Sequence, residues 1–161
     1  MTFLSWCTDY EVGVAQIDRE HHGLFDLINE YHEAHSGGAC DREIALVLNR
    51  LVAYAEEHFQ HEEALMSASA YPLLEAHREL HGKLAQTVFA INERLAVDAA
   101  RAGAEILPFV KNWLVEHIVR NDMDVADFLR RESDHAAPLD AASEERGDVA
   151  AALAAAELAA S

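Results

Sequence analysis

Histidine and carboxylate side chains recur at helical spacing around His58. In the run HFQHE, His58 and Glu62 are four residues apart, and side chains at that spacing lie one above the other on a helix. The run HRELH repeats the spacing with His77 and His81. Imidazole and carboxylate groups that share a face are typical ligands of first-row transition metals. The two runs therefore predict a metal site.

Three further candidate ligands lie in other segments, namely His21, His117 and Asp122. Five imidazoles and two carboxylates exceed what one tetrahedral zinc takes and are too rich in nitrogen for magnesium or calcium. Two ions that share both carboxylates as bridges would use all seven side chains. With an added oxygen bridge from solvent, the ion with three imidazoles is six-coordinate, and the ion with two is five-coordinate and keeps one open position. We expect both ions to be iron.

An open position on a pair of ferrous ions is suited to dioxygen. Each ion can give one electron to bound dioxygen, and the reaction can run backwards because both electrons come from the metals. A site rich in neutral imidazole favours such reversible binding over the high oxidation states that oxygenation needs. The ligand set therefore favours reversible oxygen binding over oxygenation.

Four amphipathic helices must bring these side chains together. The apolar periodicity predicts them at residues 18–36, 41–67, 72 to about 95, and 104 to beyond 129. In the first helix, Asp18 is the expected N-cap, His21 falls on the apolar face and His22 on the polar face. In the second, His61 lies beside the stripe that carries His58 and Glu62, so we expect it to be partly exposed.

The last helix is less regular. His117 and Asp122 are five residues apart, which is about 140° around an α-helix, so they are not expected to stack. Both can still face inward, because each helix of a bundle presents a wide wedge to the core. We expect this helix to accommodate Pro108 in its first turns.

These elements predict an all-α fold, an antiparallel up-down-up-down four-helix bundle. Residues 1–17 form an N-terminal arm whose aromatic side chains should pack on the bundle, and residues 18–133 form the bundle itself. Residues 134–161 form an acidic, alanine-rich tail, which lacks a bulky apolar face and is expected to be mobile or loosely helical.

Charge and composition exclude several classes of partner. The formal net charge of −17 argues against nucleic acid and anionic membranes, which both attract basic surfaces. No apolar run is long enough to span a bilayer, and the N-terminus does not resemble a signal peptide. With only Cys7 and Cys40 as cysteines, a reduced, cytoplasmic protein is the expectation.

The candidate segments resemble the successive ligand motifs of the hemerythrin family, most closely those of its bacterial branch, the bacteriohemerythrins. They read IDREHHGLFDLIN, HFQHEEALM, HRELH and WLVEHIVRND, and they occur in the family's order. The match covers residues 6 to about 131. A member of the family, myohemerythrin, is a known up-and-down four-helix bundle.

The resemblance implies a role for each candidate ligand. One iron would be held by three histidines, the other by two, and two carboxylates would bridge them: His77, His81 and His117; His21 and His58; Glu62 and Asp122. Dioxygen would bind at the two-histidine iron, in a pocket lined by Phe59, Trp113 and Leu114. The implied function is oxygen storage, delivery or sensing.

Two other classes of function stay open. One is a di-iron enzyme that handles peroxide or nitric oxide, or a relative of the iron–sulfur repair proteins. The repair group tends to use glutamate for both bridges and to carry an extra cysteine-bearing domain, so Asp122 and the short arm favour oxygen binding. The other is an oxygen- or redox-sensing interaction module, a class that is normally fused to a signalling domain, although the tail could recruit a protein partner.

Overall fold

The computed structural model of the chain describes residues 2–95 and 99–133, and every regular element in these ranges is helical. Four long helices follow one another: α1 spans Ala15–Ser36, α2 Asp41–Ala68, α3 Leu74–Leu95 and α4 Ala99–His117. A short 3-10 helix, η1 (Thr8–Tyr10), precedes α1, and a π-helical turn, η2 (Ile118–Asp122), follows α4. Residues 123–126 return to α-helix. The predicted all-α class is confirmed.

The chain divides into two compact units, residues 1–126 and 127–161. The first holds η1, the four long helices and η2. In the second, residues 127–133 are helical, with an ion pair between Arg130 and Asp127. The predicted tail, residues 134–161, lies outside the described residues, and the domain boundaries placed after residues 17 and 133 stay predictions.

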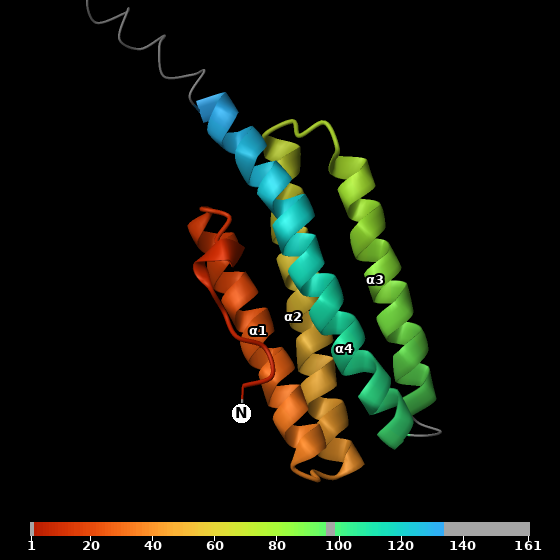
Figure 1. Ribbon diagram of the computed structural model, residues 1–161. Helices are drawn as coiled ribbons and strands as arrows, with labels where there is room; N and C mark the ends of the chain where they lie inside the picture. Colours follow the sequence, from red (N-terminus) through yellow and green to blue (C-terminus); the bar gives the residue numbers. More distant parts are fainter. Residues whose placement is uncertain (1, 96–98, 134–161) are drawn as a thin grey trace, which may run out of the picture. The chain divides into compact units, whose positions relative to one another are not determined.

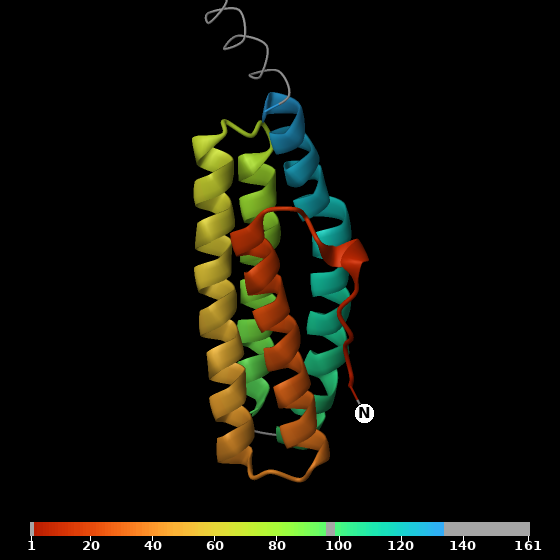
Figure 2. The same cartoon turned by 90° about the vertical axis from the view of Figure 1, so that its left-hand side faces the viewer.

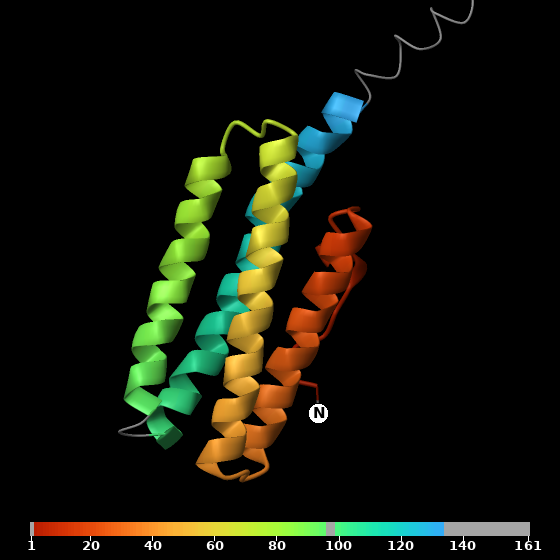
Figure 3. The same ribbon diagram turned by 180° about the vertical axis from the view of Figure 1, so that it is seen from behind.

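Consecutive long helices of the first unit run in opposite directions (Figure 1). Seen from behind, α2 and α3 lie side by side beneath the loop that joins them (Figure 3). Short connections between helices favour this antiparallel order. The predicted up-down-up-down four-helix bundle is therefore confirmed.

Each helix turns one apolar stripe toward the centre of the bundle, where side chains from all four helices pack together. The most deeply buried large apolar side chains are Ile28 and Tyr31 of α1, Leu48 and Met66 of α2, Ile106 of α4 and Ile118 of η2. These stripes continue along each helix into the positions of the candidate ligands. The hydrophobic period that forms the core therefore also places the ligands inside it.

The start of α1 corrects one expectation. The helix begins at Ala15, not at Asp18, and its N-cap Val14 makes no side-chain cap. The Asp18 carboxylate instead accepts hydrogen bonds from the backbone N–H groups of Val12, at 2.7 Å, and Gly13, at 3.1 Å. Asp18 therefore lies in the first turn and holds the chain that leads into the helix.

Two prolines also sit differently from expectation. Pro72 precedes α3, which begins at Leu74. Since α4 begins at Ala99, ahead of the expected Ala104, Pro108 lies inside the helix instead of in its first turns. A proline there has no N–H to donate to the carbonyl four residues earlier, so the helix lacks one hydrogen bond at that point.

The N-terminal arm runs along the bundle beside α1 and α4 (Figure 2). The Asn29 side chain of α1 accepts hydrogen bonds from the N–H groups of Phe3 and Leu4 and donates to the Leu4 carbonyl at 2.8 Å. From α4, the Lys111 ammonium donates to the Phe3 carbonyl at 3.1 Å. The arm is therefore tied by its backbone to two helices.

No helix among the described residues combines the length and the apolar character needed to cross a membrane.

Candidate metal centre

The seven candidate ligands converge on one point in the bundle. His21 comes from α1, His58 and Glu62 from α2, and His77 and His81 from α3, while His117 ends α4 and Asp122 ends η2. All are buried, with between 0% and 4% of their surface exposed. The structure thus brings together every side chain that was predicted to bind metal.

The Glu62 carboxylate lies between two groups of histidines. Its Oε1 atom is 3.7 Å from His21 Nε2 and 3.5 Å from His58 Nε2. Its Oε2 atom is 3.6 Å from His77 Nε2 and 3.3 Å from His81 Nε2. One oxygen therefore faces each group.

The Asp122 carboxylate is divided between the two groups in the same way. Its Oδ2 atom is 3.3 Å from His21 Nε2, while its Oδ1 atom is 3.5 Å from His77 Nε2 and 3.1 Å from His117 Nε2. The side chains thus form a two-histidine and a three-histidine group, with both carboxylates reaching each.

The residues fit a pair of metal ions. Buried polar atoms normally have hydrogen-bond partners, yet Nε2 of His21, His58 and His77 has none, and neither has Oε2 of Glu62 nor either carboxylate oxygen of Asp122. Ligand atoms bonded at about 2.1 Å and at right angles to one ion are about 3 Å apart, close to the separations seen here. Bound cations would satisfy these atoms and offset the cost of burying them.

The π-helical turn η2 brings His117 and Asp122 together. Met123 N–H donates to the Ile118 carbonyl, the five-residue hydrogen bond that defines a π-helix. The extra residue widens the turn, so that side chains five apart share a face. The expectation that this pair does not stack is therefore wrong, because it assumed α-helical geometry throughout.

In two of the five histidines, the ring nitrogen that faces away from the centre lies within hydrogen-bond distance of a glutamate carboxylate. His58 Nδ1 lies 3.0 Å from Glu20 Oε2, and His81 Nδ1 lies 3.0 Å from Glu63 Oε1. A proton on Nδ1, donated to the carboxylate, leaves Nε2 as the free lone pair directed inward. Both rings are thereby held in the tautomer that can bind metal.

The charges of the centre favour deprotonated carboxylates. Burial alone raises the pKa of Glu62, but the neighbouring imidazoles of His21, His77 and His81 hold it well below its usual value. Burial lowers the pKa of His21, yet the carboxylates of Asp122 and Glu62 outweigh this effect and raise it to about 9. The anionic carboxylates thus attract positive charge to the centre, whether a proton or a cation.

Aromatic rings cover the three-histidine group. Phe59 stacks on His81 with ring centroids 3.8 Å apart, and Trp113 stacks on His117 at 4.3 Å. Both rings, together with Leu114, border a small cavity of about 40 Å³. Phe59, Trp113 and Leu114 therefore lie together next to the centre, and the Phe59 ring also lies 5.7 Å from that of His58 in the two-histidine group.

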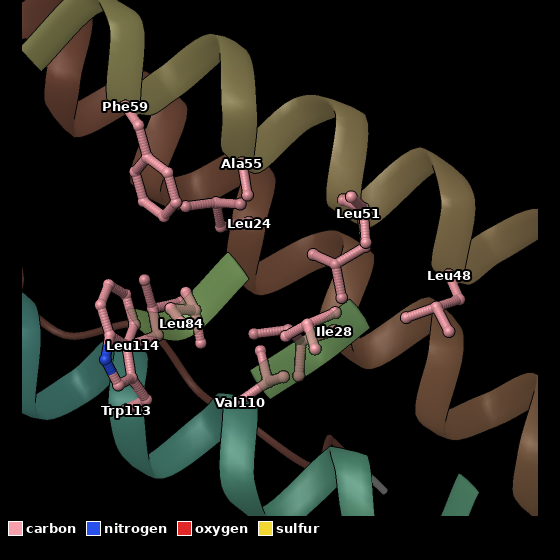
Figure 4. A pocket seen from close by; sticks show the side chains of 12 residues that line it. Leu24, Ile28, Leu48, Leu51, Ala55, Phe59, Leu84, Val110, Trp113 and Leu114 are labelled. Atoms are coloured by element: carbon pink, nitrogen blue, oxygen red, sulfur yellow. The ribbon is translucent and has the colours of Figure 1, made fainter. Parts of the chain in front are cut away.

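The cavity is lined by apolar side chains of all four helices (Figure 4). Its lining consists of Leu24, Ile28, Leu48, Leu51, Val52, Ala55, Phe59, Leu84, Val88, Val110, Trp113 and Leu114. A cavity of this volume has room for a water molecule or a diatomic gas, but none of its lining residues is ionisable, so it offers water few partners.

The remaining histidines lie outside the centre. His22 is exposed, as expected, and stacks on Trp6 of the arm at 3.8 Å. His61 is partly exposed, as expected, with 40% of its side chain accessible, and its Nδ1 lies 2.7 Å from Glu20 Oε1. His32 and His35 are half-buried. His135 lies outside the described residues.

Glu20 and Glu63 were not anticipated from the sequence. Each stands next to a candidate ligand along the chain, Glu20 before His21 and Glu63 after Glu62, but each contacts a histidine of a neighbouring helix. The periodicity of one helix carries no information about such cross-helix pairs. The acidic residue adjoining each ligand run is the one local signal that could have suggested them.

Comparisons with a family model and with known proteins agree on one family. The model of the Hemerythrin HHE cation binding domain matches residues 12–129. The chain is 31% identical over 130 residues to a bacteriohemerythrin of Pseudomonas aeruginosa, a match that covers 81% of this chain and 84% of the relative. It is 30% identical over 117 residues to a myohemerythrin of Theromyzon tessulatum, covering 73% and 86%.

Solved structures agree with these matches. A crystal structure of a hemerythrin variant superposes with a TM-score of 0.74 at 27% identity, covering 80% of this chain and 98% of the other. The fold and the order of the helices are therefore shared with that protein.

Proposed function

Because the chain belongs to the hemerythrin family, we propose that it holds two iron ions at this centre and binds dioxygen reversibly, without catalytic turnover. Its role would be oxygen storage, delivery or sensing. The relatives support a metal-binding, oxygen-related function, and the local geometry supports the finer assignment.

The observation that carries this proposal is the division of both carboxylates between the two histidine groups. Glu62 directs Oε1 and Oε2 to different groups, and Asp122 does the same with Oδ2 and Oδ1. A carboxylate in this position would serve two cations at once. His77, His81 and His117 would hold one iron, and His21 and His58 the other.

The unequal number of histidines makes the two positions chemically different. The two-histidine group has one protein ligand fewer, so an exogenous molecule is expected there. When bound in the ferrous state, the iron pair supplies the two electrons that dioxygen accepts. The histidine-rich ligand set favours their return when the oxygen leaves.

The surrounding side chains favour release of dioxygen over its reduction. Hydrogen peroxide forms only if protons reach the reduced oxygen, and the apolar lining around Phe59, Trp113 and Leu114 contains no ionisable group. Leu114 is buried and helps to exclude water from the cavity. Stacking on Phe59 and Trp113 holds the rings of His81 and His117 in place.

An anaerobic oxygen titration with iron quantitation tests the proposal. The protein should contain two irons per chain, develop a new visible absorption band when oxygen is admitted, and lose it again when oxygen is removed. A single zinc ion, or no spectral change with oxygen, would overturn the proposal. Steady consumption of hydrogen peroxide would instead assign the protein to the enzyme class.

A further inference from the structure

Two glutamates contact proposed metal ligands on the side that faces away from the centre. One contacts a histidine of the two-histidine group, and the other contacts a histidine of the three-histidine group. Glu20 of α1 reaches across to His58 of α2, and Glu63 of α2 reaches across to His81 of α3, each at 3.0 Å from Nδ1. Among the described residues these are the only side-chain carboxylates with a hydrogen bond to an outward-facing nitrogen of the five histidines. Each group thus has one histidine backed by a carboxylate.

Glu20 is itself held in place on α1. Its Oε1 atom accepts a hydrogen bond from Gln16 Nε2 at 3.0 Å and lies 2.7 Å from His61 Nδ1, which leaves Oε2 for His58. Only 14% of the Glu20 side chain is exposed. Its carboxylate therefore has a defined orientation and one oxygen dedicated to the buried imidazole.

Glu63 is held by a different group. Arg78 of α3 donates from Nε to Glu63 Oε2 at 3.0 Å and from Nη1 to Glu75 Oε1 at 2.7 Å. This leaves Oε1 of Glu63 for His81, so Arg78 fixes the carboxylate that in turn fixes the imidazole. The described contacts of Glu20 include no guanidinium that corresponds to Arg78.

We propose that Glu20 and Glu63 are positioning residues for the two metal ions, each orienting one histidine of one group. This inference rests on the proposed iron centre. A carboxylate on Nδ1 fixes the ring orientation and makes Nε2 a stronger electron donor, and loss of such partners typically lowers metal affinity about 10–100-fold. Because the two glutamates serve different groups, each should affect mainly one ion.

Competition with a chelator for Fe²⁺, under anaerobic conditions, tests this separation. Glu20→Ala is expected to weaken one of the two binding steps about 10–100-fold, and Glu63→Ala the other. Arg78→Gln should reproduce part of the Glu63→Ala effect and leave the step affected by Glu20 unchanged. Glu33→Ala on α1 and Glu57→Ala on α2, two exposed glutamates, are matched controls and should bind both ions as the unsubstituted protein does.

Nuclear magnetic resonance of the Zn²⁺-loaded protein identifies the histidine involved. In Glu20→Ala, the Nδ1 proton of His58 should exchange faster with solvent, while that of His81 is unchanged. Glu63→Ala should show the reverse pattern. A purely structural role would change both signals or neither.

Glutamine substitutions separate orientation from charge. Glu20→Gln keeps an oxygen that accepts the same hydrogen bond, so it should recover most of the iron affinity lost in Glu20→Ala. It lacks the negative charge that makes His58 a strong donor, so the reduction potential of the centre should lie above that of the unsubstituted protein.

Two results would overturn the inference: unchanged affinity for both ions in the two alanine variants, or an equal loss at both steps in each. If the unsubstituted protein fails to bind two ions, the proposed function fails instead. The two failures are therefore distinguishable.

Discussion

His117 Nε2 and Asp122 Oδ1 lie 3.1 Å apart although five positions separate these residues along the chain. An α-helix would point the two side chains about 140° apart. The π-helical turn η2 removes this difference, and π-turns of this kind are frequent at functional sites. The ligand set of the centre thus depends on a local departure from α-helical geometry.

Inserting one alanine after Val119 tests the role of this turn. Val119 is 47% exposed and lies inside η2. The insertion places the Asp122 side chain six residues after His117, a spacing that neither an α-helix nor a π-turn brings onto one face, so the aspartate should rotate away from the histidine. We expect iron content to fall well below two per chain, as measured by metal analysis of the purified protein. Val119→Ala keeps the residue count and should leave the iron content unchanged. Full iron occupancy in the insertion variant would show that the spacing within the turn does not position Asp122.

Three neighbouring ionisable side chains of α2 provide a second test. His58→Ala and Glu62→Ala should each reduce iron content well below two per chain, because each removes a buried group that faces the centre. His61→Ala should keep both irons, since His61 is partly exposed and contacts Glu20 instead. Iron analysis of the three variants decides the matter, and loss of one iron from His61→Ala would contradict the assignment of faces on α2.

The metal-free protein should lose stability as the solution becomes alkaline. His21 has a pKa of about 9 in the folded chain against an ordinary value of 6.5, because the carboxylates of Asp122 and Glu62 outweigh the effect of burial. The resulting stabilisation, roughly 3 kcal/mol, is fully present below pH 6.5 and disappears as the pH rises through about 9. Denaturant unfolding of the apo-protein at a series of pH values measures this. In His21→Gln the decline over this pH range should be absent.

Acid should weaken the metal-free protein for a separate reason. The pKa of Glu62 lies well below its ordinary value of 4.5, since nearby imidazoles outweigh its burial. Its contribution is present above pH 4.5 and is lost as the pH falls through the lower value in the folded chain. Maximum stability of the apo-protein is therefore expected between about pH 4.5 and 6.5. A maximum above pH 9 would contradict the assignment of His21, and an absence of any loss in acid would contradict that of Glu62.

Leu114 allows the cavity to be changed without touching a ligand. Leu114→Ala should lower the unfolding free energy by about 2–5 kcal/mol, because it enlarges a buried apolar space. Iron content should stay at two per chain, while the lifetime of the oxygenated protein, followed by its visible absorption, should shorten as water gains access. Leu46→Ala, at an exposed leucine of α2, is the matched control. An unchanged lifetime would show that Leu114 does not protect the site.

Much of the centre could be predicted from the chain alone. Residues such as His58 and Glu62 belong to a regular pattern within one helix, where spacing determines which side chains share a face. The same periodicity distinguished exposed His22 from buried His21 and predicted four helices of roughly the right extent. Asp18 and Pro108 were misplaced because the starts of helices depend on contacts with preceding segments as well as on local preference.

The relation of His117 to Asp122, the glutamates behind His58 and His81, and the cavity beside Leu114 became visible only in three dimensions. Amino-acid spacing specifies directions around a single regular helix, so it identified which residues face inward. It cannot specify a widened turn or which side chain of a neighbouring helix meets a given ring. Those relationships arise from the packing of four helices against one another, and they decide how the ligands are oriented.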